Sequence, residues 1–112
     1  MQFESLNRAE LKGRIGTVKV TRLSETSMAR LSVATNYAYK DSDGCAVIET
    51  TWHTVIVWEG KGASRETIES LAKGDAVHVL GRIRLQKYTD SEGVERTMPE
   101  IIANQVEKMS TE

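Results

Sequence analysis

Two short segments of the sequence contain side chains that bind nucleic acids through different physical forces. Trp52 and Trp58 lie in "ETTWHTVIVW" (49–58), and Arg82, Arg84 and Tyr88 lie in "AVHVLGRIRLQKY" (76–88). An aromatic ring stacks on a nucleobase, which contributes roughly 1–3 kcal/mol per base, and a guanidinium group binds phosphate. Each residue taken singly is ordinary, as a tryptophan under a loop or a solvated arginine. Rings and cations sharing one surface would instead favour an unpaired nucleic-acid strand.

Both segments have the two-residue period of β-strands, which sorts their side chains onto two faces. Trp52 and Trp58 are predicted to share one face, with Val55 and Val57 on the other. In the second segment the arginines and Tyr88 are predicted to face outward. The residues predicted to face the core are Val77, Val79, Gly81, Ile83 and Leu85. The pattern therefore predicts an outer face that carries both rings and cations.

Five strand-like runs and one short helix must position these residues. The runs cover residues 10–23, 28–40, 47–58, 75–90 and 95–107, and turn sequences such as "DSDG" and "DSEG" separate most of them. Between the third and fourth runs, Ser64 is a predicted N-cap, and Lys73 with a C′ Gly74 is predicted to end the helix. This order is that of the OB-fold, an all-β, five-stranded Greek-key barrel with one helix.

Glycines inside the strands favour a closed barrel. Gly13 and Gly16 interrupt the first run and Gly81 the fourth, as expected for bulges or sharp coiling. A two-sheet sandwich is the competing all-β architecture. We predict one OB-fold domain over residues 1–112, with a core of about residues 9–107.

Composition limits the kinds of function. The 112 residues are 39% hydrophobic and 28% charged, with a formal net charge of -1, so a polyanion site requires local clustering of cations. The single cysteine, Cys45, cannot form an intramolecular disulfide, which indicates a reducing compartment. We find no apolar run of membrane-helix length and no signal-peptide pattern, and expect a cytoplasmic protein without membrane contact.

The sequence lacks the patterns of common catalytic and metal sites. Cys45 and His53 have no third group to orient them, and His53 and His78 lack the spacing of zinc ligands. The segment 41–44 ("DSDG") is predicted to be an ordinary turn, since it departs from a calcium-loop pattern. We therefore expect no enzymatic activity, no metal and no cofactor.

Five blocks of the sequence carry a family resemblance. "LKGRIG", "ARLSVATN", "TTWHTVIVW", "LAKGDAVHVLGRIRLQKYTDSEGVER" and "PEIIANQV" occur in the order found in the bacterial single-stranded DNA-binding protein (SSB) family. The chain resembles this family from Leu11 to Val106. The resemblance implies an OB-fold that binds single-stranded DNA without marked sequence preference, in replication, recombination or repair. It also implies a nucleoid-associated homotetramer, with a dimer as the alternative, and possible replication or repair proteins as partners.

The resemblance also assigns roles to individual residues. The implied stacking residues are Tyr39, Trp52, Trp58 and Tyr88. The implied phosphate-binding residues are Arg14, Lys40, Arg82, Arg84, Lys87 and Arg96. His53 occupies a position that the family places at or near a subunit contact. The family commonly has tryptophan where this chain has Tyr39 and Tyr88, so stacking there involves a smaller ring.

Two departures keep other functions open. The chain stops at "EKMSTE" without the linker and acidic tip typical of the family, as part of a longer protein or as a shorter relative. The segment 58–70 ("WEGKGASRETIES") also differs from the family pattern. The alternatives are a protein-docking barrel similar to primosomal replication protein N, and an accessory domain of an enzyme. Leu80 and Ile56 are predicted outside the barrel, where a second copy would cover them.

Overall fold

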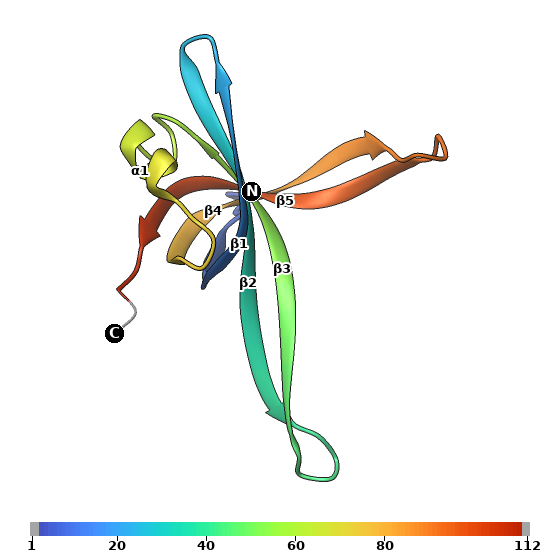
Figure 1. Ribbon diagram of the computed structural model, residues 1–112. Helices are drawn as coiled ribbons and strands as arrows, with labels where there is room; N and C mark the ends of the chain where they lie inside the picture. The colour runs from blue at the N-terminus through green and yellow to red at the C-terminus, as the bar shows by residue number, and fades with distance from the viewer. Residues whose placement is uncertain (1–2, 111–112) are drawn as a thin grey trace.

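Five strands and one short helix follow the predicted chain order. The computed structural model describes residues 3–110. The elements are β1 (Ala9–Leu23), β2 (Thr26–Lys40), β3 (Ala46–Trp58), α1 (Arg65–Ser70), β4 (Ala76–Thr89) and β5 (Glu95–Lys108). The strands close into a barrel in the order β1-β2-β3-β5-β4, with α1 beside it (Figure 1). The predicted five-stranded barrel is confirmed, and the two-sheet sandwich is excluded.

Glycines allow the strands of the barrel to approach one another closely. The β1–β2 register shifts between Ile15 and Thr17, where Gly16 is the extra residue of β1. The β4–β5 register shifts where Leu80 pairs with Gln105 and Gly81 with Ala103, so the extra residue there is Asn104 of β5. A Cβ atom on Gly81 would lie 2.3 Å from the carbonyl oxygen of Ile102, closer than real side chains come. The bulge predicted in the first strand is therefore present at Gly16, whereas the bulge near Gly81 lies in the facing strand β5, and Gly13 causes no register shift. Bulges of this kind bend the strands of a small closed barrel.

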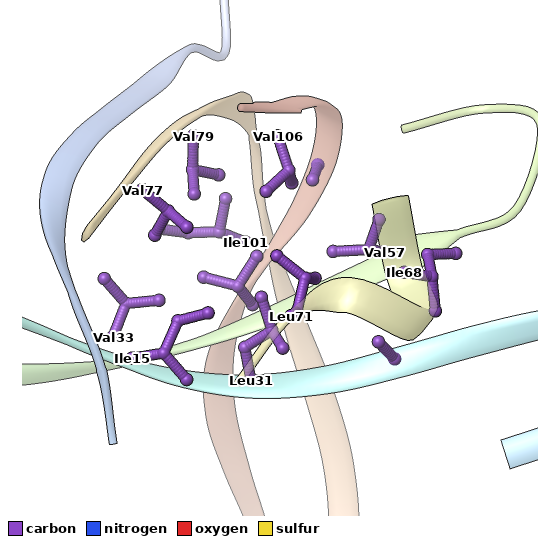
Figure 2. Packing of buried hydrophobic residues seen from close by; sticks show 13 residues of the cluster. Ile15, Leu31, Val33, Val57, Ile68, Leu71, Val77, Val79, Ile101 and Val106 are labelled. Carbon is purple, nitrogen blue, oxygen red and sulfur yellow. The ribbon is translucent and has the colours of Figure 1, made fainter. Parts of the chain in front are cut away.

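The core consists of aliphatic side chains from all five strands and from α1. Figure 2 shows them converging inside the barrel, with Leu31 and Val33 from β2 facing Val77 and Val79 from β4. Ile68 of α1 is fully buried and closes one end of this cluster. Burial of this apolar surface is the main favourable contribution to folding.

The helix begins as predicted and ends earlier than predicted. The Ser64 side chain accepts a hydrogen bond from the Thr67 amide at 3.1 Å, which confirms the N-cap. Leu71 is already extended and buried, so the helix ends at Ser70, and the predicted C′ role of Gly74 is wrong. Gly74 has φ 92° and instead forms the turn into β4, where its amide donates to the carbonyl of Ile15. The helix therefore stops where Leu71 turns into the core.

The β2–β3 and β4–β5 hairpins project from the barrel as long arms, as does the β1–β2 hairpin (Figure 1). The prediction that Ile83 and Leu85 face the core is wrong, because they are 48% and 65% exposed. Burial alternates along β4 only as far as Gly81, and every later residue of the strand is exposed because no layer opposes it once the hairpin leaves the barrel. Within residues 3–110, no helix has the length and hydrophobicity needed to cross a membrane.

Ile56, predicted to be available to a second copy, is 3% exposed. It pairs with Arg30 of β2 on one side and with Ile102 of β5 on the other. These neighbours cover it within the chain, so this part of the prediction is wrong. Leu80 is half-buried.

The contrast between barrel and arm predicts unequal stability effects of two leucine truncations. Leu31 is 1% exposed in the core, and we expect Leu31→Ala to lower the free energy of unfolding by about 2–5 kcal/mol. Leu85 is 65% exposed, and we expect Leu85→Ala to change it by about 0.5 kcal/mol or less. Urea unfolding followed by tryptophan emission measures both. Equal losses would contradict the placement of Leu85 outside the core.

Candidate nucleic-acid interface

The aromatic residues of β3 share the outer face of the barrel with the arginines of β4. Ile56, between Trp52 and Trp58 on the same side of β3, pairs with Ile102 of β5, which in turn pairs with Arg82 of β4. Since paired residues lie on the same face of a sheet, this register extends one face across three strands. Trp52 is 61% exposed and Trp58 half-buried, and neither belongs to the core cluster. The predicted shared surface therefore exists.

The Trp52 indole reaches from β3 across β2 to β1. In the register, Trp52 lies opposite Ala34, and Ala34 lies opposite Arg14 of β1. A Cβ atom on Gly16 would meet indole atoms Cζ3 and Cη2 of Trp52 at 2.4 and 2.8 Å. Ala34 and Gly16 thus leave room for the ring where larger side chains would displace it. The bulge glycine of β1 provides a seat for the indole in addition to bending the strand.

The cations of the β4–β5 arm are paired with carboxylates. Arg96 donates from Nε to Asp90 at 2.6 Å, and Lys87 lies 3.8 Å from Glu95. The hydrogen bond from Arg96, followed by the one from the Val94 amide, holds the pKa of Asp90 below its ordinary value. The Lys87–Glu95 pair is solvent-exposed and therefore weak, whereas in the Arg96–Asp90 pair the guanidinium is exposed and the carboxylate is half-buried. A phosphate group is able to compete with the carboxylates for the cations.

Tyr88 and Arg96 are cross-strand partners near the tip of this arm. They pair in the β4–β5 register and line one open cleft together with Glu95 and Thr97. Tyr88 is 44% exposed and lies on the same side of β4 as Arg82 and Arg84. The ring and the guanidinium at this position are therefore adjacent, which is the combination predicted from the sequence.

Tyr39 lies apart from the other predicted stacking residues. It pairs with Val47, and by the alternation of the β2–β3 arm it faces away from the side that carries Trp52. Its ring stacks on Tyr37, with centroids 5.9 Å apart and an interplanar angle of 28°. Lys40 ends β2 on the Trp52 side, opposite Ala46. The aromatic set is thus divided between the two sides of this arm.

Arg14 and His53 each make one intramolecular hydrogen bond. Arg14 shares the row of Ala34 and Trp52, and its guanidinium donates to the carbonyl of Gly74 at 2.9 Å. His53 is half-buried, and its Nε2 lies 2.9 Å from the hydroxyl of Thr35. The predicted subunit contact of His53 stays a prediction.

Sequence reasoning missed a triad of charged residues in the middle of the face. Glu100 of β5 is 3% exposed, and its two carboxylate oxygens accept from Arg30 and Arg84, each at 3.0 Å. Arg84 was predicted to bind phosphate, whereas Arg30 and Glu100 were not singled out. Two signals were available: Arg30 occupies an even, outward position of its strand, and Glu100 is a lone carboxylate in the apolar run "MPEIIA" (98–103).

The turn at the tip of the β2–β3 arm has the predicted form. Asp41 accepts hydrogen bonds from the amides of Asp43 and Cys45 at 2.9 Å, and Gly44 has φ 79°. Cys45 is exposed there. Over residues 3–110 there is no group of three or more histidine, cysteine or acidic side chains arranged to hold a metal ion.

Relatives of this chain are known from sequence. The single-stranded DNA-binding protein of Xanthomonas axonopodis pv. citri is 35% identical over 106 residues, which are 93% of this chain and 58% of that protein. That of Neisseria meningitidis serogroup A is 33% identical over 107 residues, 94% of this chain and 60% of that protein. The mitochondrial single-stranded DNA-binding protein of Drosophila melanogaster is 35% identical over 105 residues, 92% of this chain and 70% of that protein. This chain thus spans about 60% of the length of the two bacterial relatives.

Solved structures of similar fold support the barrel. A Plasmodium falciparum SSB in complex with ssDNA superposes with a TM-score of 0.77 at 24% identity. The superposition covers 98% of this chain and 100% of that one. A deletion mutant of the Thermus aquaticus single-stranded DNA-binding protein gives a TM-score of 0.76 at 18% identity, covering 94% of this chain and 51% of that one. At this identity the likeness concerns the fold alone.

The family resemblance found in the sequence is confirmed. The model of the single-strand binding protein family matches residues 6–109, which include all five strands and the helix. This chain belongs to the single-strand binding protein family.

Proposed function

We propose that this chain binds single-stranded DNA without marked sequence preference. The observation that carries the proposal is the common outer face of β3, β5 and β4, on which Trp52, Arg82 and Tyr88 are all exposed. Each base offers a ring face for stacking, and each phosphate offers a charge for a guanidinium. Neither interaction depends on base identity, so the surface is suited to any unpaired strand.

The rings supply the contacts to the bases. The far edge of the Trp52 indole rests over Gly16, while 61% of the residue remains exposed to a base. A ring that already occupies its binding position loses little rotamer freedom when a base stacks on it. Trp58 and Tyr88 extend the stacking surface along β3 and along the β4–β5 arm.

The cations supply the salt-dependent part of the binding. Lys87 and Arg96 are exposed and paired with the carboxylates of Glu95 and Asp90, and a phosphate replaces these partners when DNA arrives. Counterions released from the DNA then favour binding at low salt. This local clustering explains how a chain with a formal net charge of -1 binds a polyanion.

The relatives support DNA as the ligand. The curated relatives are named single-stranded DNA-binding proteins, and one solved structure of the same fold is a complex with ssDNA. The protein-docking alternative is not favoured by these relatives. We further propose that the chain acts in replication, recombination or repair, as a nucleoid-associated homotetramer in the cytoplasm.

The proposal predicts quenching and affinity losses that follow the outer face. We expect oligo-dT to quench the tryptophan emission at low salt. We expect Trp52→Ala and Tyr88→Ala each to weaken binding by about fivefold to 100-fold, because each removes one stacked base. Leu85→Ala, exposed on the opposite side of β4, is the control, and we expect no more than about a twofold change there. Unchanged emission together with no retained oligonucleotide would contradict the proposal, and tighter binding of oligo-rU than oligo-dT would make RNA the ligand.

Gly16→Ala tests whether the seat under Trp52 contributes to binding. Gly16 does not have a positive φ, so the backbone accepts alanine, but the new methyl group displaces the indole. We expect binding of oligo-dT to weaken by about threefold to tenfold, with the urea midpoint little changed. In the Trp52→Ala background, the same substitution has no ring to displace and is expected to leave the affinity unchanged. An equal loss in both backgrounds would show that Gly16 acts through the barrel and not through the indole.

A further inference from the structure

The triad of Arg30, Glu100 and Arg84 lies between the two tryptophans of the outer face. Arg30 is opposite Ile56, which is between Trp52 and Trp58 on β3. Trp58 follows Trp52 by six positions, which corresponds to about 20 Å along a strand. A nucleic-acid strand that stacks on both indoles therefore carries its phosphates across the intervening surface. The triad occupies that surface.

The triad unites two guanidinium groups from strands that are not neighbours. Arg30 comes from β2 and Arg84 from β4, with β3 and β5 between them in the barrel. The carboxylate of Glu100 bridges them, with Oε2 3.0 Å from Nη1 of Arg30 and Oε1 3.0 Å from Nη2 of Arg84. Without a shared carboxylate the two cations would repel each other and their long side chains would rotate freely.

Burial differs sharply within the triad. Glu100 is 3% exposed, whereas the side chains of Arg30 and Arg84 are 44% and 46% exposed. Each guanidinium has five N–H donors and directs one of them to Glu100, which leaves donors available to a ligand. The triad as a whole carries a charge of +1. It presents cations to the solvent and hides the anion that holds them.

We propose that Glu100 is a positioning residue for phosphate binding, and that Arg30 is a phosphate-binding residue in addition to those predicted. This inference rests on the proposed function and extends it. Glu100 holds Arg30 and Arg84 together so that both donate to the phosphates of a strand passing between Trp52 and Trp58. Pre-ordered donors lose less conformational entropy on binding, so the buried carboxylate strengthens DNA binding although its charge has the same sign as that of DNA.

The surroundings favour DNA over a second copy of this chain as the ligand of the triad. Trp52 is exposed on the same face, and Arg82 lies opposite Ile102 at the edge of the triad. Ile56 and Ile102, the apolar residues between the arginines, are 3% and 8% exposed and have little surface left for a protein partner. What the face exposes at the triad is cationic, which matches a polyanion.

The test compares two glutamate-to-glutamine changes on β5. Glu100→Gln and Glu95→Gln remove the same charge, but Glu95 is 69% exposed near the tip of the arm and lies 3.8 Å from its nearest cation, Lys87. Without a positioning role, both changes strengthen oligo-dT binding or leave it unchanged. We expect Glu100→Gln to weaken binding by about threefold to tenfold and Glu95→Gln not to weaken it.

Coupling separates positioning from a general structural effect. In an Arg30→Gln, Arg84→Gln background, Glu100 has no guanidinium to position, and we expect Glu100→Gln to cause no further weakening. Arg30→Gln alone is expected to reduce the slope of log affinity against log salt by about 0.7, the loss of one phosphate contact on a single strand. The arginine variants also serve if Glu100→Gln fails to fold.

Three results would overturn the inference. The first is that Glu100→Gln binds oligo-dT as tightly as the unchanged chain or more tightly. The second is that Arg30→Gln leaves the salt slope of binding unaffected. The third is that the triad variants change the molecular mass of the protein in light scattering but leave its DNA affinity unchanged. The last result would assign the triad to a contact between copies. If the unchanged chain itself binds no oligo-dT, the proposed function fails, whereas binding without these effects removes only the positioning role.

Discussion

Parallel pairing of β3 with β5 is the constraint on which the candidate interface depends. Only two residue pairs make this connection, Val55 with Ile101 and Ile56 with Ile102. It joins the β2–β3 arm, which carries the tryptophans, to the β4–β5 arm, which carries the arginines and Tyr88. Because side chains alternate along each strand, Val55 and Ile101 point into the barrel, and Ile56 and Ile102 lie on the outer face. The same junction therefore closes the core and assembles the outer face.

Glycines provide space for close contacts on both the inner and the outer face of the barrel. On the inside, Gly81 lets β4 approach the backbone of β5 where a side chain would collide with the carbonyl of Ile102. On the outside, the bulge at Gly16 makes room for the Trp52 indole. A closed barrel of five strands must bend sharply, and at Gly16 the bend falls on a residue without a side chain. Such positions are able to receive a large ring from a strand two places away.

The charge arrangement explains how the chain combines a near-neutral total with a surface for a polyanion. Acidic side chains pair with cations on the β4–β5 arm and at the triad. On the arm the cations are exposed, and the Lys87–Glu95 pair, in which both partners are exposed, exchanges readily with solvent or phosphate. At the triad the acid is buried, so the cations remain held in place. The two kinds of pairing give the same face a mobile and a pre-ordered set of donors.

The sequence by itself determined the strand order, the helix start, the bulge at Gly16 and the side of each strand on which the tryptophans and arginines lie. These features follow from local alternation, capping and glycine placement, which need only neighbouring residues. Where alternation alone was used to predict burial, it failed for Ile83 and Leu85, which have no opposing layer, and for Ile56, which its neighbours Arg30 and Ile102 cover.

Only the tertiary structure decided which distant side chains meet. Glu100 accepts from arginines 70 and 16 positions away, the Trp52 ring rests over a glycine of β1, and Tyr39 faces away from Trp52. Such contacts arise from the register between strands and the closure of the barrel. These are long-range properties that the pattern within any one strand does not contain.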